Sequence, residues 1–271
     1  MGDYRDDARK QLKRAQAELA SGDDQRLKYA ALELREAMES VTYDRAEAYK
    51  DDFPPEQYEA WQPRRVMGLL LEIDPNADKD STIAFGEEPS LGVKPAVMHT
   101  LGTEKVLNMK MLKKHYDALG SYLHVPTLKQ MAVSDKIDFA AMRQRCEIIA
   151  AFITDVLGSP VFNSTFGNFA TIDCMKCGKP IKRRWPEGKE QIEAKCFECG
   201  AGYLVKDIGN AQCEWKPDVV ELACANKECG TKINPFRHEV ELGVGWDCED
   251  CGGRNVMRLG VAHIPKAEDG F

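Results

Sequence analysis

Eight cysteines form four short pairs in the C-terminal part of the chain, and their spacing suits metal binding. The first set is Cys174, Cys177, Cys196 and Cys199, and the second is Cys224, Cys229, Cys248 and Cys251. Zinc takes four thiolates in a tetrahedron, and two cysteines separated by a few residues can reach adjacent corners from one tight turn. Each set therefore predicts one structural, four-thiolate metal site.

The two sets form a tandem repeat. The third and fourth cysteines of the sets are offset by 52 residues, and eighteen residues separate the two pairs in each set. Glycine follows the second cysteine of every pair, at Gly178, Gly200, Gly230 and Gly252. Glycine tolerates positive φ, so the chain can wrap around a metal and aim backbone N–H groups at the sulfurs. The stretches KPIKRRW and QIEAKCF predict a β-hairpin between the first two pairs, with its turn at residues 186–188.

Over residues 172–258 this pattern resembles the zinc ribbon family. The resemblance implies a small β-sheet in each unit and two structural Zn²⁺ ions. The four residues inside the Cys224–Cys229 pair are a departure from the two in the other pairs, and they stay within the spacing that such sites use. A disulfide framework is the alternative in an oxidising compartment, and iron is the alternative metal for four cysteines. Catalytic zinc is disfavoured because four thiolates leave no position for water.

Four residues between the first two cysteine pairs predict a nucleic-acid contact, namely Lys182, Arg183, Arg184 and Trp185. Basic side chains beside an aromatic ring can bind a nucleic-acid backbone and stack on a base. The alternative is that the arginines are solvated edge residues and Trp185 covers the core of the ribbon. The corresponding stretch of the second unit, INPFRHEVEL, has one arginine and two glutamates, so any such contact belongs to the first unit.

The composition of the whole chain limits its partners. The 271 residues carry a net charge of -7, which opposes a protein-wide attraction to nucleic acid or to anionic lipid. No apolar run approaches the ~20 residues of a membrane helix, and MGDYRDDARK has acidic residues where a signal peptide has an apolar core. We therefore expect a soluble, cytoplasmic protein without a membrane partner.

The N-terminal half predicts a bundle of amphipathic helices, because its apolar residues recur at steps of three and four. The three stripes are Leu27, Ala30, Leu34, Ala37 and Val41; Val106, Met109, Leu112, Tyr116, Leu119 and Leu123; and Met142, Cys146, Ile149, Ile153 and Val156. Helix starts are predicted at residues 21–23, 103–104 and 134–135. In the long connection at 74–103, STIAF and VKPAVM predict short strands or a flap.

These patterns together predict an α+β, multidomain protein, with an all-α helical bundle followed by two small β zinc ribbons. The expected domains are a bundle at 1–160, a first ribbon at 161–212, and a second ribbon with a C-terminal tail at 213–271.

Two histidines are candidate catalytic residues, His115 and His124, in MKMLKKHYDALGSYLHVPT. The fourth helix is predicted to end at Leu119–Gly120, with His124 in the following turn. Gly120 and His124 before a final helix resemble the HEPN superfamily, many of whose members cleave RNA without a metal. The resemblance implies an arginine before the histidine, and positions 117–120 do not supply it. The alternative is that His124 caps the carbonyls of a helix end.

The function predicted from these features is a zinc-binding adaptor or sensor in a bacterial assembly, of the kind used in phage defence, acting through protein partners or nucleic acid. One alternative is a HEPN-type ribonuclease with RNA recruited by the first ribbon. A second alternative is a non-catalytic protein that binds RNA or DNA. The oligomeric state does not follow from the sequence.

Overall fold

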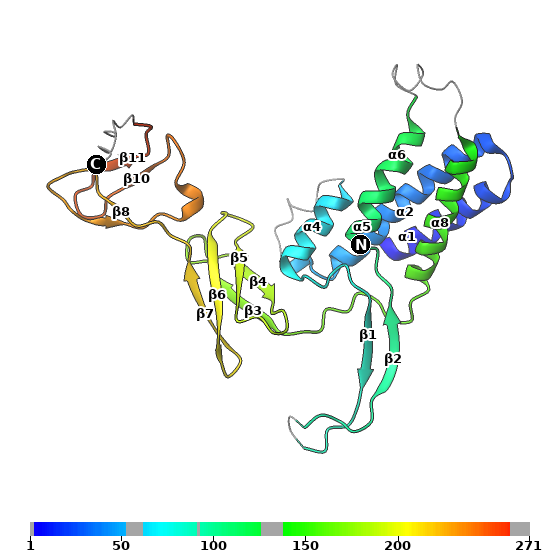
Figure 1. Ribbon diagram of the computed structural model, residues 1–271, viewed down its shortest axis with the longest axis horizontal. Coiled ribbons are helices and arrows are strands. Elements are labelled where there is room, and N and C mark those ends of the chain that lie inside the picture. The colour runs from blue at the N-terminus through cyan, green and yellow to red at the C-terminus, as the bar shows by residue number, and fades with distance from the viewer. Residues whose placement is uncertain (1–2, 53–61, 91–92, 126–137, 261–271) are drawn as a thin grey trace, which may run out of the picture. The chain divides into compact units, whose positions relative to one another are not determined.

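The computed structural model describes residues 3–52, 62–90, 93–125 and 138–260. The chain divides into two compact units, Met1–Phe169 and Ala170–Phe271, and each is described by itself (Figure 1). The first unit holds the long helices and the second holds short antiparallel strands, so the protein is of the α+β class. The division of the second unit into two ribbons at residue 212 stays a prediction.

Helix α2 is the centre of the first unit, because α1, α4, α6 and α8 all pack against it (Figure 1). The helices are α1 (Tyr4–Ala20), α2 (Leu27–Glu47), α4 (Pro63–Ile73), α5 (Met109–Met111), the π-helical turn η3 (Leu112–Tyr116), α6 (Asp117–Leu123) and α8 (Phe139–Leu157). The predicted stripes of α2 and α8 are buried in full. Cys146 lies in this core, and burial raises the pKa of its thiol to about 11, as expected of a packing residue.

The side chains that cap these helices are mostly aspartates. Asp3 and Asp138 accept the backbone N–H groups of Asp6 and Ala141 at the starts of α1 and α8. Asp23 accepts the N–H of Gln25 in the 3₁₀ turn η1 (Asp24–Arg26) ahead of α2, within the start predicted at 21–23. Such caps satisfy donors that the helix itself leaves unpaired. The start predicted at 134–135 lies outside the described residues.

The first unit is not all-α, which corrects the prediction. Strands β1 (Ser81–Phe85) and β2 (His99–Glu104) form an antiparallel hairpin with a bulge after Ile83 (Figure 1). STIAF is β1, as predicted, but residues 93–98 form no strand. The helix start predicted at 103–104 is also wrong, because these residues end β2, and the side chain of Asn108 caps the helix instead.

The helix predicted to end at Leu119–Gly120 continues to Leu123, so this prediction is wrong as well. Gly120 has a different role, which is to leave space for a neighbouring side chain. A β-carbon at this position would lie 2.1 Å from Nη1 of Arg35, so glycine makes room for the guanidinium. The same guanidinium stacks on the ring of Tyr116 at 4.0 Å. Glycine therefore leaves space for a contact between α2 and α6, made by the end of a flexible arginine side chain, and does not mark the end of a helix.

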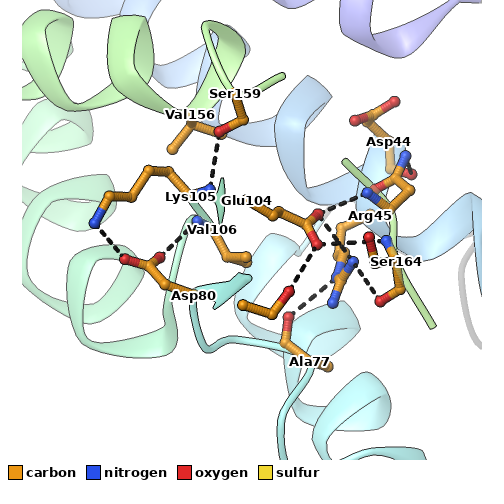
Figure 2. Close-up of polar contacts among 12 residues, drawn as sticks. Asp44, Arg45, Ala77, Asp80, Glu104, Lys105, Val106, Val156, Ser159 and Ser164 are labelled. Atoms are coloured by element: carbon orange, nitrogen blue, oxygen red, sulfur yellow. Dashed lines mark hydrogen bonds and ion pairs between the residues drawn. The ribbon is translucent and has the colours of Figure 1, made fainter. Parts of the chain in front are cut away.

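A buried ion pair fixes the base of the hairpin to the helices (Figure 2). The guanidinium of Arg45 lies 3.1 Å from the carboxylate of Glu104, and both side chains are almost fully buried. Glu104 also accepts the backbone N–H of Asn163 at 2.6 Å, while Arg45 donates to the carbonyl of Ala77 at 3.1 Å. One carboxylate therefore joins α2, β2 and the chain that follows α8.

A second buried pair lies beside the first. Arg5 of α1 lies 3.1 Å from Asp44 of α2 and donates to the carbonyl of Val156 in α8 at 3.0 Å. The cavity that these two pairs line measures about 10 Å³, which is room for about one water molecule. This polar cluster is consequently a structural tie between helices and not a ligand pocket.

Up to residue 260, where the described chain ends, the second unit is built from four short hairpins and one additional strand. Its strands are β3 (Phe169–Asp173), β4 (Pro180–Arg184), β5 (Gln191–Lys195), β6 (Gly202–Gly209), β7 (Gln212–Pro217), β8 (Leu222–Ala223), β9 (Lys232–Ile233), β10 (Gly245–Asp247) and β11 (Arg254–Val256). The antiparallel pairings are β3 with β4, β5 with β6, β6 with β7, β8 with β9, and β10 with β11. Among the described helices, none has the length and apolar character needed to cross a bilayer.

The predicted hairpin between KPIKRRW and QIEAKCF is wrong in its pairing, although both stretches are strands. β4 pairs with β3 and β5 pairs with β6. The chain does turn at 186–189, where the N–H of Lys189 donates to the carbonyl of Pro186 at 3.3 Å. The two cysteine turns and the turn between β4 and β5 are each six residues long, so loop length alone does not decide the pairing.

Candidate metal centres

Every cysteine pair lies in the turn of its own hairpin. The turns follow β3, β5, β8 and β10, and the chain returns from them as β4, β6, β9 and β11. An antiparallel ladder fixes the two ends of such a turn a short distance apart. The sheets therefore hold the cysteines in pairs, and two turns together supply four sulfurs.

Three of the four turns share one backbone hydrogen-bond pattern. In the first, the N–H of Cys174 donates to the carbonyl of Lys179 and the N–H of Gly178 donates to the carbonyl of Cys174, both at 2.8 Å. The turns at Cys196 and Cys248 repeat the pattern, while the longer Cys224 turn closes on Thr231 at 2.8 Å. The four glycines after the pairs have φ between +67° and +77°, as the sequence predicted.

The sulfur positions fit a single tetrahedral ion at each site. Thiolates about 2.3 Å from a central zinc lie about 3.8 Å from one another. The Sγ atoms of Cys174 and Cys199 lie 3.6 Å apart, as do those of Cys177 and Cys196. At the second site the Sγ atoms of Cys224 and Cys251 lie 3.8 Å apart, and those of Cys229 and Cys248 lie 3.7 Å apart. All four sulfurs of each set lie within 4.8 Å of one another.

These distances disfavour two of the alternatives that the sequence left open, disulfides and an iron–sulfur cluster, while a single iron ion bound by four thiolates would share the geometry of zinc. A disulfide joins two sulfurs at about 2.05 Å, and all the cysteines are free. An iron–sulfur cluster needs wider spacing, because each thiolate binds its own iron around a multi-atom centre. The two sites are thus consistent with two structural zinc ions. Four thiolates close each coordination sphere, so the chemistry that zinc supplies is a cross-link between two hairpins.

Tyr203 of β6 contacts a cysteine ligand of the first site. Its hydroxyl lies 3.2 Å from Sγ of Cys174 and accepts the backbone N–H of Met175 at 2.9 Å. Burial alone would raise the pKa of Cys174, but hydrogen bonds from Tyr203 and from the N–H groups of Cys177 and Lys176 lower this pKa to about 6. These donors favour the thiolate, which is the form that binds metal.

Thr231 has a comparable place at the second site. Its hydroxyl lies 3.2 Å from Sγ of Cys229 and 2.5 Å from a carboxylate oxygen of Asp250. Hydrogen bonds with the side chain and the backbone of Thr231 lower the pKa of Cys229 to about 7. The two sites therefore use different partners, a buried tyrosine in one and a partly exposed threonine in the other.

The four residues predicted to contact nucleic acid lie in or next to β4. Arg183 is only 4% exposed, its guanidinium donates to the carbonyls of Lys182 and Lys195, and it stacks over Phe197 at 4.5 Å. Trp185 packs against the core of the first site and donates from Nε1 to the carbonyl of Lys189 at 3.0 Å. Arg183 therefore joins β4 to β5. Lys182 and Arg184 are half-buried. Contact of these four residues with nucleic acid stays a prediction.

The structure does not bring the two candidate catalytic histidines to one exposed surface. His115 is 3% exposed inside the π-helical turn, and burial, together with Lys114 and Arg145, lowers its pKa. Its Nδ1 has no hydrogen-bond partner in the described part of the chain. His124 is exposed and follows the last residue of α6 as its C-terminal cap position. Catalytic roles for either residue stay predictions.

Comparison with known proteins identifies no relative. No family model matches the chain, and no curated protein or solved structure matches it significantly. The HEPN resemblance gains no support from these comparisons. What the chain shows by itself is two four-cysteine clusters that fit zinc and are consistent with zinc ribbons.

Tyr203→Phe is expected to weaken zinc binding at the first site about 10- to 100-fold, the usual effect of removing a hydrogen bond to a metal ligand. The change removes the hydroxyl beside Cys174 and keeps the ring that packs in the core. Competition titration with a chromophoric chelator measures the affinity of the first site, and Tyr29→Phe, which changes a tyrosine that is 61% exposed, is the control. Equal affinities in wild type and variant would contradict the role given to Tyr203.

Sequence reasoning missed Tyr203 and also the segment that lies over the first site. The alternation in GYLVKDIG signals strand β6 and places Tyr203 and Val205 on its buried face. Nothing in a single sequence tells which buried tyrosine reaches a metal ligand, because the contact between Cys174 and Tyr203 spans 29 residues.

Proposed function

We propose that this protein is a non-catalytic, zinc-binding adaptor that acts by binding another protein. The observation that carries the proposal is the closed character of both metal sites. Each cluster offers four cysteine sulfurs around one position, which leaves no coordination position for water or substrate. Zinc in such a site shapes a binding surface and does not perform chemistry.

The hairpin β1–β2 supports the role of a protein partner. It projects from the helices of its unit (Figure 1), and Phe85 and Leu101 are each 56% exposed. Val97, between the two strands, is 63% exposed. The strand residues from Ser81 to Phe85 carry no charge, so the surface suits an apolar protein partner better than nucleic acid.

A quantitative affinity purification from the native host tests this proposal. The tagged wild type is compared with the double variant Phe85→Ser/Leu101→Ser, and bound proteins are quantified by mass spectrometry. A partner protein is expected to co-purify with the wild type, and its amount is expected to fall with the hairpin variant. Ile148→Ser, which changes an equally exposed apolar residue of α8, is the matched control and should retain the partner. Partners that bind all three proteins equally would contradict the proposal.

One contact favours a second candidate function, cleavage of RNA. The HEPN resemblance lacks an arginine next to His124 in the sequence, and Arg145 of α8 lies over the ring of Tyr122, near the end of α6, at 5.9 Å. An arginine from another helix could stabilise phosphate charge beside His124. If this function is correct, expression of the wild type degrades cellular RNA, and His124→Ala and Arg145→Ala each abolish the degradation. Intact RNA with the wild type excludes it.

A further inference from the structure

One short segment of the second metal loop lies against the first metal site. We name residues 236–239 the covering segment; it comprises Phe236 and the 3₁₀ turn η4 (Arg237–Glu239). In the sequence it lies between Cys229 and Cys248, two ligands of the second site. Its side chains nevertheless contact residues of the first site. Each contact is made by a different side chain.

Phe236 packs on the tyrosine that supports the first site. The rings of Phe236 and Tyr203 meet edge to face with centroids 5.8 Å apart, and Tyr203 carries the hydroxyl that bonds Cys174. Phe236 also belongs to the apolar residues that pack around the core of the first site. Edge-to-face aromatic pairs fix the orientation of both rings. Phe236 therefore helps to hold Tyr203 in the position from which it reaches the sulfur.

Glu239 holds the first cysteine turn by an ion pair. Its carboxylate lies 2.6 Å from Nζ of Lys176, which stands between Cys174 and Cys177. The other carboxylate oxygen accepts the backbone N–H of Phe236 at 3.0 Å. Both side chains are partly buried, so solvent screens this pair less than an exposed one. The covering segment and the first turn are thus joined directly.

His238 holds the second cysteine turn of the same site. A β-carbon on Gly200 would lie 3.1 Å from the imidazole ring, so the ring rests on the glycine that follows Cys199. Gly200 has φ +77° and is required by the turn in any case. Backbone hydrogen bonds complete the attachment: the N–H of Arg237 donates to the carbonyl of Asp218 at 2.9 Å, and the N–H of Asp218 donates to Gly202 of β6 at 2.8 Å.

We infer that the covering segment couples the two metal sites, so that zinc binding at the second site strengthens zinc binding at the first. Zinc at the second site fixes both ends of the loop that carries the segment and lowers the entropy lost when the segment docks. The docked segment then holds both turns of the first site. By linkage, zinc at the first site must strengthen binding at the second by the same factor.

The first experiment removes the second site and measures the affinity of the first. In the full-length Cys248→Ser protein, competition with a chromophoric chelator is expected to show binding at the first site weakened about 5- to 150-fold, the usual range for coupled sites. Cys177→Ser should weaken the second site by the same factor. Unchanged affinity at the remaining site in both variants would overturn the inference.

A second experiment keeps all eight ligands, because a cysteine variant can fail to fold for other reasons. Phe236→Ala/Glu239→Gln should still bind two zinc ions, with the first site weakened and the response to the second site lost. Glu221→Gln is the matched control, since it breaks an exposed ion pair, at 2.9 Å, between the residue before β8 and Lys232 of β9. If the double variant retains the wild-type affinities, the segment is not the coupling element and the inference fails.

The inference depends on zinc in both clusters and not on the adaptor role. The zinc content of the wild type, measured first by elemental analysis, separates the two. Two zinc ions per chain with independent affinities contradict the coupling alone, while the partner experiment on the hairpin decides the adaptor role separately.

Discussion

Removal of zinc by a strong chelator is expected to unfold the second unit and to leave the helices of the first unit folded. The apolar core of the second unit is small and lies around the first site. The strands around the second site, β8 to β11, are two or three residues long. Units of this kind depend on bound metal for much of their folding free energy, on the order of 10 kcal/mol per structural zinc.

Tryptophan fluorescence and circular dichroism measure this result together. Trp185, Trp215 and Trp246 lie in the second unit, so its unfolding dominates the change in emission. The helical dichroism should persist, because the long helices belong to the first unit. Zinc added back should restore the emission. A chelator-treated protein with unchanged tryptophan emission would contradict a structural role for the metal.

Cys213→Ser is the matched control for the metal ligands. Cys213 is a half-buried cysteine of β7 that belongs to neither cluster. The variant should keep two zinc ions and the emission of the wild type, whereas Cys196→Ser should lose the first zinc. Loss of zinc from the Cys213 variant would show that the ligand sets are wrongly assigned.

Glu104→Ala is expected to destabilise the first unit by about 3–5 kcal/mol, because it leaves the buried Arg45 guanidinium without its counter-charge. It also removes the acceptor of the backbone N–H of Asn163, in the segment that follows α8. Chemical denaturation followed by helical dichroism measures the free energy of unfolding. The loss is large because a buried charge has no water to replace its partner.

Arg64→Ala is the control for this prediction. Arg64 forms an ion pair with Asp117 at 2.8 Å, and both side chains are about half exposed. Exposed pairs contribute about 0–1 kcal/mol, so the variant should unfold close to the wild type. A Glu104→Ala protein as stable as the Arg64→Ala protein would show that the buried network contributes little.

Local patterns in the sequence were sufficient for the ligands and for the helical stripes. The cysteine pairs and their glycines are confirmed as turns with positive φ, because a two-residue spacing and a glycine determine such a turn by themselves. The stripes of α2 and α8 are confirmed as core, since helical periodicity alone decides which face is apolar. These features depend on residues a few positions apart.

Predictions that needed a partner from elsewhere in the chain were less successful. β4 and β5 were correctly identified as strands and wrongly paired, since each has its partner across a cysteine turn. Gly120 was read as a helix end, although its role depends on Arg35, 85 residues away in the chain. Glu104 was read as a helix start, while the tertiary structure places it in a strand and pairs it with Arg45.

The sequence by itself determined which atoms form the two candidate metal sites, and only the tertiary structure decided what holds those atoms in place. Ligand identity follows from thiol chemistry and short spacing. The support from Tyr203, Phe236 and Glu239 depends on contacts between segments 28 to 63 residues apart, whose geometry follows from packing and not from any local pattern. The two cysteine sets are similar in sequence, but in the structure the loop of the second set, through residues 236–239, lies on the first site.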